Sequence, residues 1–278
     1  MKVSRRQFLY SAGAAGVAGT GLYTWRIEPH WLEIVRRPLP VRSLPGPLVG
    51  RTLAQLSDIH VGPRVDDDYV VTVFEQVAAL RPDIVVVTGD LVSHHDRVFE
   101  QMEGVYRYFP RGRIATVGIP GNHDYGPAWS HPEIADRVVS IAQQCGIVML
   151  RNHVHEVEGL QIVGLDDLWA RRFEPQLAFA GYDSRRPAIA LSHNPDTVDL
   201  PVWEQYEGWI LSGHTHGGQC KAPFLPPPLL PVTNRRYTQG EFRLSGPRSM
   251  YINRGVGHLL HVRINVRPEV TLFELRRA

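Results

Sequence analysis

Apolar and polar positions alternate in two ways along the first half of the chain. Three short apolar runs are typical of buried β-strands, and they occupy residues 52–57, 83–88 and 114–118. Between the first two runs, apolar residues recur at helical spacing, and the aspartates at 66–68 offer N-caps. This helical face consists of Val70, Val71, Phe74, Val77 and Leu80. A further helix is predicted at 132–144.

The second half of the chain is richer in strand-like runs. The expected strands cover residues 147–150, 160–165, 188–192, 208–212, 249–253, 261–266 and 269–275. Alternating strands and helices followed by many strands predict an α/β fold with a second sheet packed on the first. No internal repeat interrupts this pattern.

The residues before position 51 differ from the rest. Pro and Gly are dense in 37–50, which predicts a linker between an N-terminal segment, 1–36, and a folded domain, 51–278. Residues 30–37 are expected to pack as a helix against the domain, or else to lie along a membrane surface. The apolar stretch 8–23 is too short and too weakly hydrophobic to predict a membrane span.

The first residues resemble a targeting signal. Ser4-Arg5-Arg6-Gln7-Phe8-Leu9 followed by a Gly- and Ala-rich stretch resembles a twin-arginine export signal. This resemblance implies that the export machinery is a partner. It places the protein in the periplasm, in the cell wall or on the outer face of the inner membrane. Because no strong cleavage site follows, the segment can also remain as a membrane anchor.

Composition adds limits. The net charge of the 278 residues is +2, and Lys2, Arg5 and Arg6 account for three positive charges, so the remaining body is near neutral. A near-neutral body gives no reason to expect nucleic acid as a partner. The two cysteines, Cys145 and Cys220, do not have a metal-binding spacing. Whether they pair in an oxidising compartment stays open.

Five polar segments, most of which follow an apolar run, carry the candidate chemistry. They are Asp58-Ile59-His60, Gly89-Asp90, Gly121-Asn122-His123-Asp124, Ser192-His193-Asn194-Pro195-Asp196 and Gly213-His214-Thr215-His216-Gly217-Gly218-Gln219. They supply oxygen and nitrogen donors without sulfur, a set that suits divalent ions such as Mn, Fe or Zn. The period-two rule for strands predicts that Asp58 and His60 share one face, and that His214 and His216 do so where the backbone is extended.

In this order and spacing the segments resemble the calcineurin-like metallophosphoesterase superfamily. The Gly-His-Thr-His-Gly-Gly-Gln form resembles its exported or membrane-attached bacterial branch. The resemblance implies a four-layer sandwich of two mixed β-sheets flanked by helices. It also implies two divalent metal ions that share Asp90. One ion would be held by Asp58, His60, Asp90 and His216, and the other by Asp90, Asn122, His193 and His214.

The same resemblance assigns a different role to the remaining residues of the third segment. His123 would face the leaving-group oxygen as a general acid, and Asp124 would orient its ring. Asp167 and Asp196 are weaker candidates for supporting carboxylates. The arginines of Arg235-Arg236-Tyr237 and Asn253-Arg254-Gly255 would either bind phosphate or form structural salt bridges.

The implied function is metal-dependent hydrolysis of a phosphodiester or pyrophosphate bond. The substrate would be an anionic phosphoester, such as an envelope lipid or a nucleotide-sugar lipid. Two alternatives stay open: a broad phosphomonoesterase, and a non-catalytic envelope-binding protein that retains the fold. The stiff apolar loop at 226–231 is expected to pack against the domain, or else to face an acyl chain or a membrane.

Overall fold

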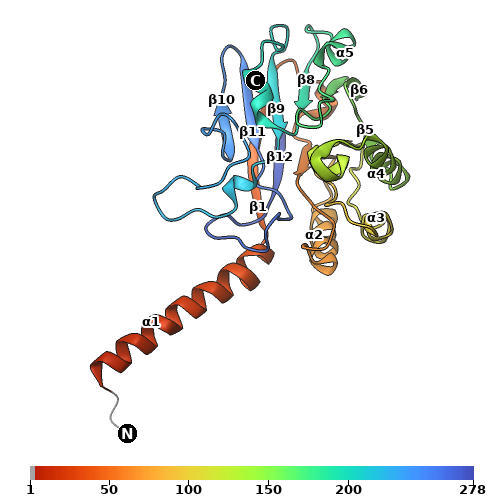
Figure 1. Cartoon of the computed structure of the whole chain (residues 1–278). Helices are drawn as coiled ribbons and strands as arrows, with labels where there is room; N and C mark the ends of the chain where they lie inside the picture. The colour runs from red at the N-terminus through yellow and green to blue at the C-terminus, as the bar shows by residue number, and fades with distance from the viewer. Residues whose placement is uncertain (1–3) are drawn as a thin grey trace.

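Two mixed β-sheets packed face to face form the centre of the domain in the computed structural model, which describes residues 4–278 (Figure 1). The first sheet has the strand order β1-β12-β2-β3-β4-β5, and the second has the order β10-β11-β9-β8-β7-β6. The strands of the first sheet are β1 (Glu33–Val41), β2 (Thr52–Leu56), β3 (Ile84–Thr88), β4 (Ala115–Ile119), β5 (Val148–Met149) and β12 (Glu269–Arg277). Those of the second are β6 (His153–Val157), β7 (Leu160–Gly164), β8 (Ala188–Leu191), β9 (Gly208–Ser212), β10 (Gly240–Arg243) and β11 (Arg248–Ile252).

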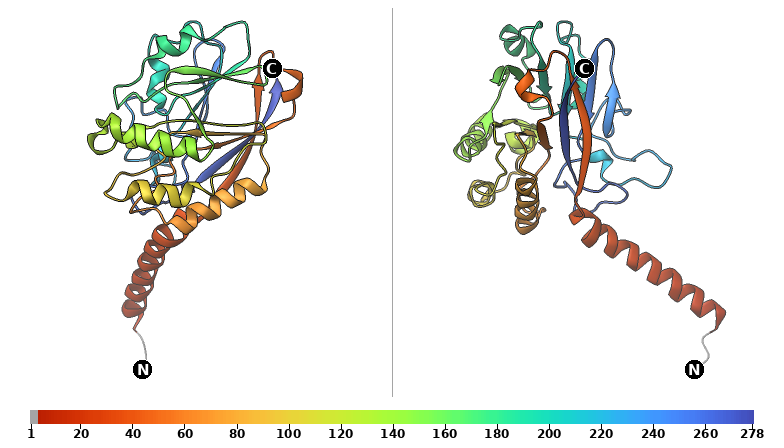
Figure 2. Two further views of the ribbon diagram at one scale, coloured as in Figure 1. Left: turned by 90° about the vertical axis from the view of Figure 1, so that its right-hand side faces the viewer. Right: turned by 180° about the vertical axis from the view of Figure 1, so that it is seen from behind.

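Helices and loops cover the outer faces of both sheets, as the two views of Figure 2 show. The helices of the domain are α2 (Asp67–Ala79), α3 (Val98–Tyr106), α4 (Pro132–Gln144) and α5 (Pro175–Ala180). The first three pack on the outer face of the first sheet, whereas α5 and loop residues such as Trp203 pack on that of the second. The predicted four-layer sandwich of two mixed sheets flanked by helices is therefore confirmed.

The side chains of β3 show how the sequence produces these layers. Val85 and Val87 pack among the helices, while Ile84 and Val86 pack between the two sheets. Successive side chains of a strand point to opposite faces, so a strand in the middle of a four-layer fold must be apolar at every position. The same division applies to β9, where Leu211 lies between the sheets and Ile210 faces the outer layer.

The segment predicted to be a linker differs in the structure. Residues 33–41 form β1, which pairs in parallel with β12 along its whole length. Leu39 and Val41 are buried between the sheets and alternate with the exposed Pro38 and Pro40. Proline is tolerated in an edge strand because its missing N–H can point away from the ladder. The predictions of a linker at 37–50 and of a helix at 30–37 are therefore wrong for residues 33–41. The proline content of this segment obscured its alternation of buried and exposed positions.

The expected strand at 261–266 is also wrong. Only one isolated bridge, between Cys220 and Ile264, involves this segment. The Arg263 side chain is fully buried and donates hydrogen bonds to the carbonyls of Arg254, Gly255, Gly257 and Val266. A buried guanidinium that ties together loop carbonyls replaces the strand ladder here.

The N-terminal residues form α1 (Arg5–Leu22), which extends away from the domain (Figures 1 and 2). The Ser4 hydroxyl accepts a hydrogen bond from the Gln7 N–H and caps the helix. No side chain of α1 is buried. Within residues 4–278, none of the helices combines the length and the apolar character needed to cross a membrane.

Candidate metal centre

The five polar segments meet where the two sheets come together, because each lies just beyond the carboxyl end of a strand. Asp58 and His60 follow β2, and Asp90 follows β3. His193 follows β8, and the loop after β9 carries His214 and His216. The carboxyl ends of parallel strands lie at one edge of each sheet, which is where open α/β sheets place their sites.

Two clusters of possible metal ligands result. Asp58, His60 and His216 offer one set of donor atoms, and Asp90, His193 and His214 offer a second. In each cluster the donor atoms lie within 4.8 Å of one another, and all six residues are buried. The two clusters are adjacent, because Oδ2 of Asp90 lies 3.5 Å from Nε2 of His60.

The backbone reaches this arrangement by a route that the period-two rule does not describe. Asp58 and His60 have φ angles of 50° and 54°, and His214 and His216 have φ angles of 71° and 50°. Asp90 is left-handed as well, with a φ angle of 54°. These pairs converge because their backbone leaves the strand conformation. The period-two rule is therefore the wrong reason for Asp58 and His60, and its condition of an extended backbone is not met at His214 and His216. Left-handed non-glycine residues cost free energy and gather at functional sites.

Hydrogen bonds fix the orientation of three of the four histidine rings. Nδ1 of His193 donates to the carbonyl of Thr88 at 2.7 Å, and Nε2 of His214 donates to the carbonyl of Pro231 at 2.8 Å. Nδ1 of His60 bonds to the Ser93 hydroxyl at 3.0 Å. Each bond leaves the other ring nitrogen directed at the cluster, as ligation requires.

The buried polar atoms of the site fit a pair of cations. Both Oδ1 and Nδ2 of Asn122 are buried without a hydrogen-bond partner among the described residues. Nε2 of His60 lies 3.1 Å from Nε2 of His216, and Nδ1 of His214 lies 3.2 Å from Nε2 of His193. Facing nitrogens and an unpaired amide are costly without a shared ligand, and a divalent ion satisfies them. The clusters therefore fit a binuclear centre.

Electrostatics of the site agree with ligation by neutral rings. Burial lowers the pKa of His214 to about 3 and holds that of His216 well below its usual range. Burial also raises the pKa of Asp58 to about 6. Burial also disfavours the charged form of His193. The adjacent Asp90 carboxylate stabilises that form more strongly and raises the pKa of the ring. A bound cation would take over the role of the proton on His193.

Glycines let the backbone close tightly around the ligands. A Cβ atom on Gly213 would overlap with the Ser57 hydroxyl and the Asp58 carboxylate. The Ser57 hydroxyl donates to that carboxylate at 2.6 Å, and the His214 N–H reaches both of its oxygens at 3.0 Å. Gly217 and Gly218 have positive φ angles, and added Cβ atoms there would overlap with Gln239 and Pro227. The backbone at these two glycines therefore packs directly against the neighbouring loops.

His123 lies beside the centre with its ring half-buried. The ring centroid is 5.0 Å from that of His60, at 80° to it. The predicted support from Asp124 is absent, since the Asp124 carboxylate accepts backbone N–H groups from Leu91, Val92 and Gly121. Asp124 therefore holds together the loops after β3 and β4. The prediction that it orients the His123 ring is wrong.

Two tryptophans flank the same side of the centre. The Trp169 ring meets the His214 ring edge to face, with centroids 4.4 Å apart. Trp129 lies 4.7 Å from Trp169 and 6.3 Å from His123 by ring centroids. Trp129 and its neighbour Ala128 both have positive φ angles, so the loop is strained where it presents the indole.

Three of the remaining candidates, Arg254, Arg235 and Asp196, bond to protein groups of the surrounding loops and strands. Arg254 forms ion pairs with Glu269 and Glu33, and Arg235 donates to the carbonyls of Pro227 and Pro228. The carboxylate of Asp196 accepts the N–H groups of Thr233 and Asn234, whereas Asp167 is buried and its pKa is raised to about 7 by burial. Cys145 and Cys220 are both free.

Sequence reasoning missed the residues that orient the rings. Ser93 and the carbonyls of Thr88 and Pro231 contact ligand histidines, and Trp169 packs on one. Thr88 and Pro231 act through backbone carbonyls, which every residue has, so no residue type could reveal them. The position of Ser93, three residues after Asp90, was the one available signal.

A binuclear metal site suits metal-dependent hydrolysis, including that of phosphoesters, and comparison with known proteins gives the family. Residues 51–218 match the family model of the calcineurin-like phosphoesterases. The chain belongs to this family and is a metal-dependent phosphoesterase with two metal sites.

Three relatives are similar to this chain over almost its full length. It is 31% identical to the uncharacterized metallophosphoesterase YkuE of Bacillus subtilis, over 99% of this chain and 98% of the relative. It is 30% identical to the phosphodiesterase YaeI of Escherichia coli, over 98% and 99%. It is 27% identical to the UDP-2,3-diacylglucosamine pyrophosphatase LpxG of Chlamydia trachomatis, over 94% and 96%.

Proposed function

We propose that this phosphoesterase hydrolyses a phosphodiester or pyrophosphate bond of an envelope lipid, such as a nucleotide-sugar lipid. The observation that carries the proposal is the contact of Asp90 with both ligand clusters, next to His123. The names of the relatives support the choice of bond, since one is a phosphodiesterase and another a pyrophosphatase of a diacylated glucosamine nucleotide.

The residues of the centre divide the work. Asp58, His60, His216 and Asp90 would hold one divalent ion, and Asp90, Asn122, His193 and His214 the other, with Asp90 as the bridge. When bound, the two ions supply activated water at neutral pH and neutralise phosphate oxygens. His123 would donate a proton to the leaving-group oxygen. Its backbone N–H donates to Oδ1 of Asp90 at 2.8 Å, which ties the position of the acid to that of the bridge.

Turnover of two chromogenic esters tests this function. Purified protein should hydrolyse bis-p-nitrophenyl phosphate faster than p-nitrophenyl phosphate, and added manganese should increase the rate. A preference for the monoester would favour a broad phosphomonoesterase. No turnover of either ester by protein that holds two metal ions would favour a non-catalytic envelope-binding protein.

We also propose that the chain is exported by the twin-arginine route and acts at the cell envelope. The proposal rests on the Ser4–Leu9 pattern, and α1 leaves Arg5 and Arg6 exposed for recognition. Replacing both, Arg5→Lys with Arg6→Lys, should retain the protein in the cytoplasm, as measured by cell fractionation. The consecutive exposed arginines Arg36 and Arg37 offer a matched pair, and their replacement by lysine should leave delivery unchanged. Normal delivery of the first variant would refute the proposal.

A further inference from the structure

An apolar pocket of about 370 Å³ lies directly beside the metal centre. Its walls come from two separate loops, one contributing Pro228, Leu229 and Leu230 and the other Leu259 and Leu260. His216, a metal-ligand candidate, forms part of the same wall. The pocket is large enough for a small-molecule group.

Hydrogen bonds from two side chains hold both walls in place. The Gln219 side chain donates to the carbonyls of Leu260 and Val262 at 2.7 and 2.9 Å and accepts the Leu259 N–H. Arg235 donates to the carbonyls of Pro227 and Pro228 at 3.1 and 3.2 Å. These bonds satisfy the named backbone groups of both loops, and leucine and proline side chains supply most of the lining residues.

The proline-rich wall is attached to the metal centre itself. The carbonyl of Pro231 accepts the hydrogen bond from Nε2 of His214 at 2.8 Å. Pro227 packs so closely on Gly218 that no Cβ atom fits there. A molecule whose phosphate lies at the metal centre therefore has apolar surface within immediate reach.

Apolar side chains continue from the pocket to the molecular surface. Leu229 and Leu260 are 73% and 56% exposed, and Phe224 and Leu225 of the same loop are also exposed. Next to Leu260, His261 packs against Trp25, with ring centroids 6.0 Å apart. Exposed apolar residues are ordinary when they are scattered, but a group around a pocket indicates a binding surface. Figure 1 shows these loops, between β9 and β10 and between β11 and β12, on the side of the domain nearer α1.

We propose that this pocket binds an acyl chain of the substrate while its phosphate lies at the metal centre. The inference rests on the proposed hydrolase function and assigns the lipid part of the substrate to a particular site. The flexible, featureless shape of an acyl chain suits a space lined by aliphatic side chains, and its burial is favourable for every methylene removed from water. Leu229 and Leu260, at the outer edge, would contact the distal part of the chain.

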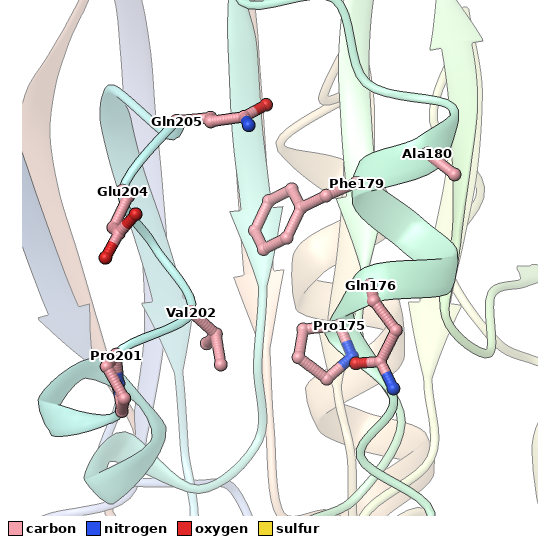
Figure 3. Close-up of a pocket in the computed structure, with 8 residues that line it drawn as sticks. All are labelled: Pro175, Gln176, Phe179, Ala180, Pro201, Val202, Glu204 and Gln205. Carbon is pink, nitrogen blue, oxygen red and sulfur yellow. The ribbon is translucent and has the colours of Figure 1, made fainter.

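A second pocket of similar volume differs from this one in the residues that line it. It has a volume of about 390 Å³ and lies between α5 and the segment 201–205, where the Phe179 ring points toward Val202 (Figure 3). Its lining includes Gln176, Glu204 and Gln205 and none of the metal-ligand candidates. The exposed Leu177 on α5 nearby provides a control position, since its exposed fraction of 57% matches that of Leu260.

A chain-length series tests the inference. The probes are alkyl p-nitrophenyl phosphates from ethyl to decyl, used below their critical micelle concentrations, with manganese present. For the unaltered protein, kcat/KM should rise by about two- to fourfold per added methylene until the pocket is full, since full burial of one methylene corresponds to a factor of about four. The double variant Leu229→Asp with Leu260→Asp should flatten this series when each rate is expressed relative to that variant's own rate with the ethyl ester. Leu177→Asp should leave the series unchanged.

The outcomes separate the two proposals. Turnover of the ethyl ester with no dependence on chain length would overturn the acyl pocket and leave the hydrolase function standing. No turnover of any ester in the series would overturn the hydrolase function, and with it the acyl pocket that rests on that function. An unaltered slope in the double variant would place the chain elsewhere. Because the replaced leucines are exposed, melting temperatures of all variants should match that of the unaltered protein, which excludes misfolding as the cause.

Discussion

Oδ2 of Asp90 lies 3.2 Å from Nε2 of His193, and both side chains are buried. The same oxygen is within 3.5 Å of a histidine of the other ligand cluster. One carboxylate thus contacts both clusters, and it is the residue best placed to serve two cations at once. A neutral amide at this position would keep the shape and lose one of the two oxygen donors.

Asp90→Asn should therefore remove bound metal and activity together. The measurements are metal content by mass spectrometry and turnover of bis-p-nitrophenyl phosphate on the same preparation. Asp136→Asn changes an aspartate whose side chain is 65% exposed, and it should alter neither quantity. Full metal content with full activity in the Asp90 variant would contradict the bridge.

His123→Ala should retain both metal ions but slow turnover by about 10²–10⁴-fold, the usual contribution of a general acid. The ring lies beside His60 without belonging to either ligand cluster, so metal content should not change. His153→Ala, at an exposed position on β6, is the matched control. An unchanged rate in the His123 variant would exclude this ring from the reaction.

Gly213→Ala should reduce both the stability of the fold and the affinity for metal by steric overlap alone. The new methyl group would overlap with Ser57 and Asp58, so we expect a loss of about 1–3 kcal/mol in the free energy of unfolding and a weaker affinity for metal. Gly104→Ala provides the opposite case, because nothing lies within 4 Å of the added methyl group in α3. That variant should gain about 0.5–1 kcal/mol from better helix propensity. Urea unfolding of both variants measures the contrast, and equal effects would refute it.

Asp83 should contribute stability that depends on pH. Burial alone would raise its pKa, but hydrogen bonds from Thr52 and the charge of Arg113 outweigh burial and hold the pKa below its usual range. A lowered pKa in the folded state means that stability is present above the unfolded pKa of about 3.9 and is lost as pH falls through the lower folded value.

Asp83→Asn should therefore reduce the free energy of unfolding near neutral pH by about 1–2 kcal/mol, a modest effect because the partner arginines are half-exposed. The difference from the unaltered protein should shrink as the pH is lowered below the unfolded pKa of about 3.9. Urea unfolding at several pH values measures it, with the exposed Asp96→Asn as control. A difference that is the same at every pH would show that the charge of Asp83 does not stabilise the fold.

The interior strands and the helices α2 and α4 could be predicted because their patterns are local. β3 is apolar at every position, and α4 begins and ends where its helical period does. β1 was not predicted as a strand because its pairing partner, β12, is more than 200 residues away, and nothing near Pro38 indicates that partner. In the segment 261–266, the pattern resembled a strand, but the burial of Arg263 decided the conformation.

The ligands of the metal centre could be predicted by residue type, while their geometry could not. Histidine and aspartate at the ends of apolar runs indicate a metal site, and the resemblance to the metallophosphoesterases placed all six cluster residues among the ligands. The left-handed conformation of Asp58 and His214 depends on contacts from other loops, so a local rule failed there. Asp124 shows the same limit, since its three backbone partners come from two different loops.

The pairing of β1 with β12 has a consequence for how the protein is made. The first sheet acquires its outermost strand only when Glu33–Val41 meets Glu269–Arg277, so the ribosome must synthesise more than 200 intervening residues before that edge can close. Until then, the apolar alternation of the early strand is open to solvent and to other nascent chains. Closure of this edge therefore depends on β12 being made, and a partial chain that lacks β12 leaves β1 without its pairing strand.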